Sequence, residues 1–199
     1  MYENHTMTEH LLIDHHDCVM IVIDAQPAFL DKLPDGERRA LVSHLCWLIG
    51  VATWLQIPLV ATAEDLPHLG GVAPEIARIL PDTSILNKMI FGLADDPAIL
   101  DAVAGTNRGT AVLTGLETDV CVAQSALGLL ERGYRVVAVA DATGSPGPAH
   151  DAGLARMRDA GVVIVQAKNL YYEWLRTVEQ VQRFRTERAD LTPPEGLRL

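Results

Sequence analysis

Six short runs of apolar, often β-branched residues recur along the chain, and longer stretches with apolar residues at helical spacing separate them. Each run predicts a buried strand, and the six expected strands cover residues 19–23, 58–62, 83–86, 110–114, 135–140 and 162–165. The intervening stretches predict helices at about 37–55, 74–80, 97–104, 122–133, 149–160 and 171–188. Continuous apolar strands joined by crossover helices specify a parallel sheet covered on both faces. We therefore expect a three-layer α/β/α sandwich.

The length of 199 residues and the 49% apolar content fit one globular domain. The pattern divides the chain into an N-terminal arm (1–17), the α/β domain (18–189) and a C-terminal tail (190–199). The sequence contains no apolar run of 18 residues and no basic-then-apolar start, which predicts neither a membrane span nor a secretory signal. Three widely spaced cysteines suggest neither a disulfide framework nor a zinc motif. A cytoplasmic location is expected.

The formal net charge of −10 narrows the classes of partner that the protein is expected to bind. It argues against nucleic acid and anionic membranes, since both attract basic surfaces. Four of the seven histidines fall within the first sixteen residues. This clustering is more typical of a mobile or partly paired arm than of a metal site. A small-molecule partner is therefore the expectation.

Cys121 is the most informative residue for chemistry. It follows the expected strand 110–114 and precedes a helical pattern that ends at Gly133. Thr118 or Asp119 could cap the helix, which would place the cysteine among free backbone N–H groups at the positive end of the helix dipole. Such a setting favours the thiolate, which is the nucleophile. The alternative is a small buried core residue, as most free cysteines are.

Two further residues are expected at the same edge of the sheet. Asp24 ends the first strand and Lys88 follows the third, and the carboxyl ends of parallel strands share one edge, where ligands bind. An aspartate there could accept the thiol proton, and a lysine could lower the pKa of the thiol. Alternatively, Asp24 caps the turn before Pro27 and Lys88 is an ordinary solvated lysine.

Together these residues carry a family resemblance. The pattern Asp-x-Gln-x-x-Phe begins at Asp24, and Gly-x-x-Thr-x-x-Cys-Val begins at Gly115. With Lys88, they resemble the isochorismatase-like cysteine hydrolases, in particular uncharacterised isochorismatase family proteins, over Val19 to Leu175. The resemblance implies a six-stranded parallel sheet of order 3-2-1-4-5-6.

The resemblance also implies roles for individual residues. Asp24 would be the base, Lys88 its cationic partner and Cys121 the nucleophile, with no cofactor. A cis peptide would join Leu116 to Glu117, and the backbone N–H groups of Glu117 and Cys121 would form an oxyanion hole. Cys121 would attack an amide carbonyl to give a thioester, which water then hydrolyses.

The sequence departs from the metal-binding branch of this family. Nicotinamidases carry an Asp-x-His pair and a further histidine, whereas this chain has Asp65 and His68 in an Asp-x-x-His spacing without a second histidine. We expect no metal, with Asp65 and His68 in a surface loop. The carboxylate of Glu117, if it faces the pocket, would favour a cationic substrate.

The pocket walls and the oligomer are less defined. Candidate substrate contacts are Gln26, Phe29, Phe91 and Leu116, although ordinary core packing is the alternative for the apolar residues among them. The family implies a homo-oligomer, dimer or larger, and the last helix, with Tyr171, Tyr172 and Trp174, is an interface candidate. The leading hypothesis is hydrolysis of a small amide or carbamoyl C–N bond. The alternatives are isochorismatase-type ether hydrolysis, without need of Cys121, and a non-catalytic member that binds a metabolite or protein.

Overall fold

The computed structural model describes residues 11–81 and 85–199. The strands are β1 (Cys18–Ile23), β2 (Leu59–Glu64), β3 (Ile85–Lys88), β4 (Thr110–Leu116), β5 (Arg135–Gly144) and β6 (Val163–Val165). The helices are α1 (Pro27–Leu30), α2 (Asp35–Trp54), α3 (Leu66–Leu69), α4 (Pro74–Ala77), α5 (Pro97–Ala104), α6 (Ala123–Glu131), α7 (Ala149–Asp159), α8 (Ala167–Leu175) and α9 (Val178–Glu187). Short 3₁₀ turns are η1 (His15–Asp17) and η2 (Leu93–Asp95), and η3 (Thr118–Val122) is a π-helical turn.

The strands form one parallel sheet in the order β3-β2-β1-β4-β5-β6. This confirms both the predicted fold class and the predicted strand order. The order reverses between β1 and β4, where Ile23 pairs with Gly115 at the carboxyl ends of the two strands. In open α/β sheets this switch point is where ligands bind.

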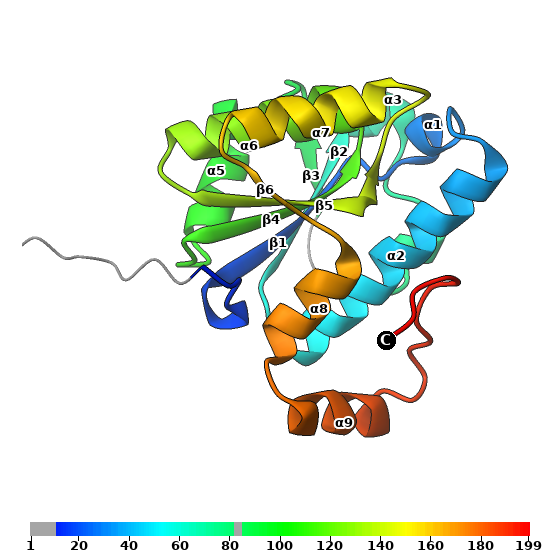
Figure 1. Cartoon of the computed structure of the whole chain (residues 1–199). Helices are drawn as coiled ribbons and strands as arrows, with labels where there is room; N and C mark the ends of the chain where they lie inside the picture. The colour runs from blue at the N-terminus through cyan, green and yellow to red at the C-terminus, as the bar shows by residue number, and fades with distance from the viewer. Residues whose placement is uncertain (1–10, 82–84) are drawn as a thin grey trace, which may run out of the picture.

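Helices cover both faces of the sheet, and each face has its own apolar cluster (Figure 1). Successive strand side chains point to opposite faces, so Met20 and Val22 pack with α2 and α8, while Val19 and Ile21 pack with α5, α6 and α7. All six residues of β1 are fully buried. The sandwich therefore holds the carboxyl end of β1 rigidly at its centre.

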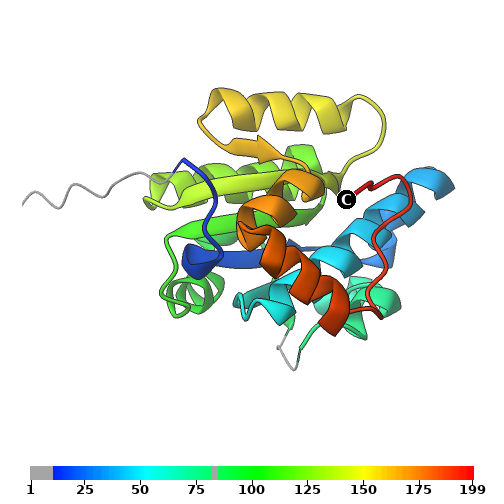
Figure 2. The ribbon, with the colours of Figure 1, turned by 60° about the horizontal axis from the view of Figure 1, so that its bottom comes forward.

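The C-terminal region differs from prediction. The single helix expected at 171–188 is two helices, α8 and α9, because the chain turns at Arg176 with a φ of +61°. Tyr171 and Trp174 are fully buried in the core, so they do not form the expected subunit interface, while Tyr172 is half exposed. The tail runs back along α2 (Figure 2), where Leu191 packs on Gly50, so it packs on its own subunit.

The part of the N-terminal arm that is described is docked on the domain. Residues 1–10, including His5 and His10, lie outside the described residues. Arg135 donates to the backbone carbonyls of Leu11 and Leu12, and the backbone N–H of Ile13 donates to Glu173. Within the ranges 11–81 and 85–199, no helix is both long and apolar enough to cross a membrane.

Candidate functional site

Asp24 stands immediately after β1 at the switch point. Its backbone turns out of the strand with a φ of +45°, and its side chain is fully buried. The Thr62 hydroxyl donates to Oδ1 at 2.8 Å. Burial raises the pKa of Asp24, and the nearby Lys88 ammonium opposes that rise. The carboxylate is thus held in an environment that makes it a better proton acceptor than a solvated aspartate.

Lys88 is the last residue of β3, where the sequence had placed it just past the strand. The side chain is fully buried, which excludes the solvated alternative. Its Nζ lies 2.9 Å from Asp24 Oδ2 and donates to the Ile90 carbonyl at 2.9 Å. It also lies 3.6 Å from Cys121 Sγ. The structure therefore brings together the three residues that the sequence singled out.

Cys121 lies in the π-helical turn η3 between β4 and α6, not in the first turn of an α-helix. Neither predicted cap is formed. Thr118 Oγ1 lies 2.9 Å from His150 Nδ1, and Ser145 donates to Asp119 Oδ1 at 2.6 Å. The two side chains tie η3 to neighbouring elements instead of closing its backbone.

The expectation of a stabilised thiolate is wrong for the unliganded site. Burial and the negative charge of Asp24 raise the pKa of Cys121, and Lys88 only partly offsets them. Desolvation and the facing carboxylates outweigh any effect of the helix dipole on the thiol pKa. The Cys121 thiol is therefore harder to ionise than a solvated thiol, so attack requires a base to take its proton.

Glu64 is a fourth member of the site that the sequence analysis did not identify. It is the last residue of β2, and the Cys121 thiol donates to its Oε2 at 3.3 Å. The same oxygen lies 3.8 Å from Lys88 Nζ. A signal was present: Glu64 follows the predicted strand 58–62 by two residues, at the same sheet edge as Asp24.

The end of β4, just before the turn that holds Cys121, has an unusual backbone. The peptide bond between Leu116 and Glu117 is cis. Gly115 has a φ of +110°, and a Cβ there would lie 1.9 Å from the Ile23 carbonyl oxygen, so only glycine fits. Glu117 pairs with Lys32 at 3.0 Å. Its carboxylate is thus partly neutralised, which weakens the argument that it favours cationic substrates.

The four predicted pocket residues occupy different environments. Gln26 is fully buried, and its amide bonds to the backbone of Glu64 and to the Gly70 carbonyl. Leu116 is also fully buried in the core. Phe29 is nearly buried beneath Lys32, whereas Phe91 is about half exposed. Gln26 and Leu116 are therefore structural, and Phe91 is the one of these four residues that presents an exposed surface.

A cation already occupies the position where a metal could bind. Ligand atoms of Asp24, Glu64 and Cys121 lie within 4.8 Å of one another. The Lys88 ammonium stands 2.9, 3.8 and 3.6 Å from them, respectively. Asp65 and His68 form a separate exposed pair at 2.7 Å, which raises the pKa of His68.

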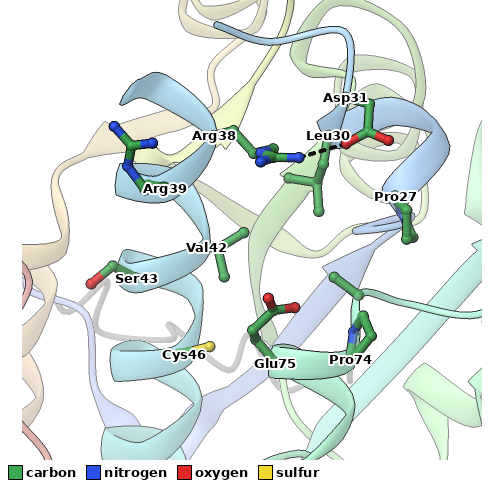
Figure 3. Close-up of a pocket in the computed structure, with 11 residues that line it drawn as sticks. Pro27, Leu30, Asp31, Arg38, Arg39, Val42, Ser43, Cys46, Pro74 and Glu75 are labelled. Carbon is green, nitrogen blue, oxygen red and sulfur yellow. Dashed lines mark hydrogen bonds and ion pairs between the residues drawn. The ribbon is translucent and has the colours of Figure 1, made fainter. Parts of the chain in front are cut away.

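A separate cavity of about 580 Å³ lies between α1, α2 and α4 (Figure 3). Its lining residues are Pro27, Leu30, Asp31, Arg38, Arg39, Val42, Ser43, Cys46, Ala73, Pro74 and Glu75. Neither Lys88 nor any of the three side chains around it, Asp24, Glu64 and Cys121, lines this cavity. Arg38 is already paired with Asp31 at 2.7 Å. The backbone N–H of Ala73, which lines the cavity, donates to the carbonyl of Ala25, the residue after Asp24.

Comparisons with known proteins identify the family of this chain. The isochorismatase domain profile matches residues 18–169. Isochorismatase domain-containing protein 2A of Mus musculus is 30% identical over 82% of this chain and 78% of its own. YcaC from Pseudomonas aeruginosa, solved with hexane-2,5-diol and covalent acrylamide, has a TM-score of 0.79 at 24% identity, covering 85% of this chain and 86% of its own.

The YcaC gene product of Escherichia coli, described as an octameric hydrolase of unknown specificity, has a TM-score of 0.80 at 23% identity. The match covers 92% of this chain and 93% of that protein. These two structures share the fold, and the sequence match extends over most of the α/β domain. The chain belongs to the isochorismatase family of hydrolases.

Proposed function

We propose that this protein is a cysteine hydrolase that cleaves a small-molecule amide or carbamoyl C–N bond. The observation that carries the proposal is the contact of Cys121 Sγ with the Lys88 ammonium at 3.6 Å, while that ammonium is ion-paired with the buried Asp24 at 2.9 Å. Burying an ammonium and a carboxylate costs desolvation free energy, which their ion pair offsets only in part. Buried ionisable groups of this kind are often found at functional sites. A thiol beside them has both a base and a cation within reach.

The proposed chemistry begins with proton transfer. The Cys121 thiol gives its proton to Asp24 as sulfur attacks the carbonyl carbon, which forms the C–S bond and moves the π electrons to oxygen. Collapse of this oxyanion breaks the C–N bond, and the departing nitrogen takes the proton from Asp24. Water then attacks the thioester carbonyl carbon and gives a proton to Asp24. Collapse of this second intermediate breaks the C–S bond and releases the carboxylic acid, and the departing sulfur takes the proton from Asp24 to restore the thiol. The raised pKa of Asp24 suits a group that must both accept and return a proton.

The oxyanion needs donors, and the backbone N–H groups of Glu117 and Cys121 are proposed for that role. In the described part of the chain, no hydrogen-bond acceptor is paired with the Glu117 N–H. Lys88 adds positive charge next to the sulfur. Asp24, Lys88 and Cys121 are the proposed catalytic residues, and Phe29 and Phe91 the proposed apolar contacts.

The relatives support parts of this proposal. Covalent acrylamide in the Pseudomonas aeruginosa structure supports the choice of amides as probes, and the octameric Escherichia coli protein supports a homo-oligomer here. A cytoplasmic location, absence of a cofactor, and the boundaries 1–17, 18–189 and 190–199 remain proposals. Ether hydrolysis is the second candidate within the family, and it would not require Cys121.

The test is a survey of amides and carbamoyl compounds, with ammonia release as the assay and intact-protein mass spectrometry after acid quench. The expected result is a substrate whose acyl group is trapped on the Cys121 peptide during turnover. Turnover that persists in Cys121→Ala would overturn the thioester mechanism and favour ether-type or other acid catalysis. Binding without turnover, across a survey that includes vinyl ethers, would favour a non-catalytic member.

A further inference from the structure

Glu64 differs from the other charged members of the site in its access to solvent. The Asp24 and Lys88 side chains are 0% exposed, whereas that of Glu64 is 22% exposed. A molecule that approaches Cys121 therefore meets the carboxylate of Glu64 before it meets either partner of the buried ion pair. Exposed polar groups in a mostly apolar pocket are the ones that set orientation and specificity.

The position of Glu64 is fixed by its backbone rather than by its side chain. Gln26 Oε1 accepts the backbone N–H of Glu64 at 2.8 Å, and Gln26 Nε2 donates to its carbonyl at 2.9 Å. The same Nε2 donates to the Gly70 carbonyl at 2.7 Å. These three hydrogen bonds from Gln26 fix the backbone at the end of β2. The Glu64 side chain, which starts from this fixed backbone, points toward Cys121 Sγ.

The charges around the thiol do not cancel. The Lys88 ammonium is paired closely with Asp24 at 2.9 Å and stands farther from Glu64, at 3.8 Å. The carboxylates of Asp24 and Glu64 together exceed the single ammonium of Lys88 by one negative charge. Because Asp24 is the close partner of Lys88, this excess charge lies on Glu64, the group that faces solvent. A ligand carboxylate placed against Sγ would lie near Glu64 and be repelled, whereas an N–H donor or ammonium would be attracted.

We propose that Glu64 is the specificity-determining residue of the site, which selects cationic or N–H-donating acyl compounds and rejects carboxylates. This inference rests on the proposed function, because it requires that ligands reach Cys121. In an amide, the nitrogen next to the scissile carbon would donate its N–H to Glu64 Oε2 while sulfur approaches the carbon. Glu64 thus touches the substrate, and Gln26 acts only as a positioning residue.

The test uses thiol reagents that need no turnover. Matched methanethiosulfonates carrying a trimethylammonium, an uncharged or a sulfonate group react with Cys121, and mass spectrometry reads each cysteine separately. Cys46, half-buried and without Glu64 as a partner, serves as the internal reference. Comparing rates as cationic-to-anionic ratios at one pH removes any effect of the thiol pKa, since that factor is common to all three reagents.

We expect Cys121 in the wild type to show a cationic-to-anionic ratio about tenfold or more above that of Cys46. Glu64→Gln, with the backbone hydrogen bonds to Gln26 intact, should reduce this excess toward one. Glu131→Gln, which removes the same charge from an exposed position on α6, should leave it unchanged. If Glu64→Gln folds poorly, Glu64→Ala provides the second variant, and high salt should lower the wild-type ratio independently.

Two failures are distinguishable. If all three reagents modify Cys121 but the ratio is the same in Glu64→Gln, the specificity role of Glu64 is refuted and the proposed nucleophile stands. If none of them modifies Cys121 in the folded protein while Cys46 reacts, no ligand reaches the thiol. The proposed function and the inference then fall together.

Discussion

Cys18 and Cys121 are both buried cysteines, and they lie at opposite ends of the parallel strands of the sheet. Cys18 begins β1 and is fully buried, while Cys121 follows β4 and is 3% exposed. Burial raises the pKa of both thiols, that of Cys18 to about 12. Neither the burial nor the direction of the pKa shift separates a reactive cysteine from an inert one.

The neighbours make the difference. The Cys18 thiol lies inside the apolar cluster of α2 and α8, which also contains Trp174. The Cys121 thiol instead contacts an ammonium at 3.6 Å and a carboxylate at 3.3 Å. A buried thiol can act only where groups beside it can take its proton and stabilise the resulting charge.

The largest expected difference between the two cysteines is catalytic. Cys121→Ala should lower kcat by about 10⁴-fold or more because it removes the proposed nucleophile. Cys18→Ala should leave kcat within about twofold and cost about 1–2 kcal/mol in unfolding free energy through the small cavity it opens. Steady-state kinetics and urea denaturation of both variants measure these effects. Equal kcat values in the two variants would contradict the comparison.

The next largest effect concerns the charges around Cys121. Lys88→Met should lower the unfolding free energy by about 3–5 kcal/mol, because it leaves the carboxylate of Asp24 buried without its cation. Lys168→Met, at an exposed position on α8, should change it by no more than about 0.5 kcal/mol. Urea denaturation at neutral pH is the measurement. A loss in Lys88→Met as small as that in the control would mean that the ion pair at 2.9 Å carries little stability.

Alkaline pH should expose the burial that the two thiols share. An unfolded cysteine loses its proton near pH 8.5, whereas Cys18 in the folded protein holds it to about pH 12. Between those values the folded state binds more protons than the unfolded state, so stability falls by about 1.4 kcal/mol per pH unit. The Cys18→Ala variant has no thiol at this position, so its unfolding free energy does not fall with pH for this reason.

The variant should therefore start less stable than the wild type at pH 8 and gain on it as the pH rises. Urea denaturation at pH 8, 9 and 10 follows the difference, and groups common to both proteins cancel. Cys121→Ala should shift in the same direction, because the pKa of that thiol is also raised. A constant difference between Cys18→Ala and the wild type across this range would show that the folded thiol titrates as in the unfolded chain.

The comparison also shows where sequence reasoning succeeds. Apolar runs predicted six buried strands, because such strands must be apolar along their whole length. The strand order was implied by the family resemblance and not by the runs themselves. Asp24, Lys88 and Cys121 were predicted to meet, since parallel strands deliver their ends to one edge.

What sequence reasoning missed depends on three-dimensional context. Glu64 was overlooked because a charged residue at a strand end looks like the start of a loop, and only the fold shows its distance from the thiol. The break between α8 and α9 depends on a positive φ at Arg176, which no residue preference predicts for arginine. The pKa of Cys121 depends on desolvation and on facing charges, neither of which spacing reveals.

The smallest expected effect concerns Glu117, the second carboxylate that the sequence placed near Cys121. Its ion pair with Lys32 is partly solvent-exposed, so Glu117→Gln should cost no more than about 1 kcal/mol in unfolding free energy. The cationic preference of Cys121 toward thiol reagents should change by less than about twofold, because Lys32 already offsets this charge. Denaturation and the labelling ratio are measured on the same preparation. A change as large as that expected from Glu64→Gln would move the specificity role from the end of β2 to Glu117, the residue that follows β4.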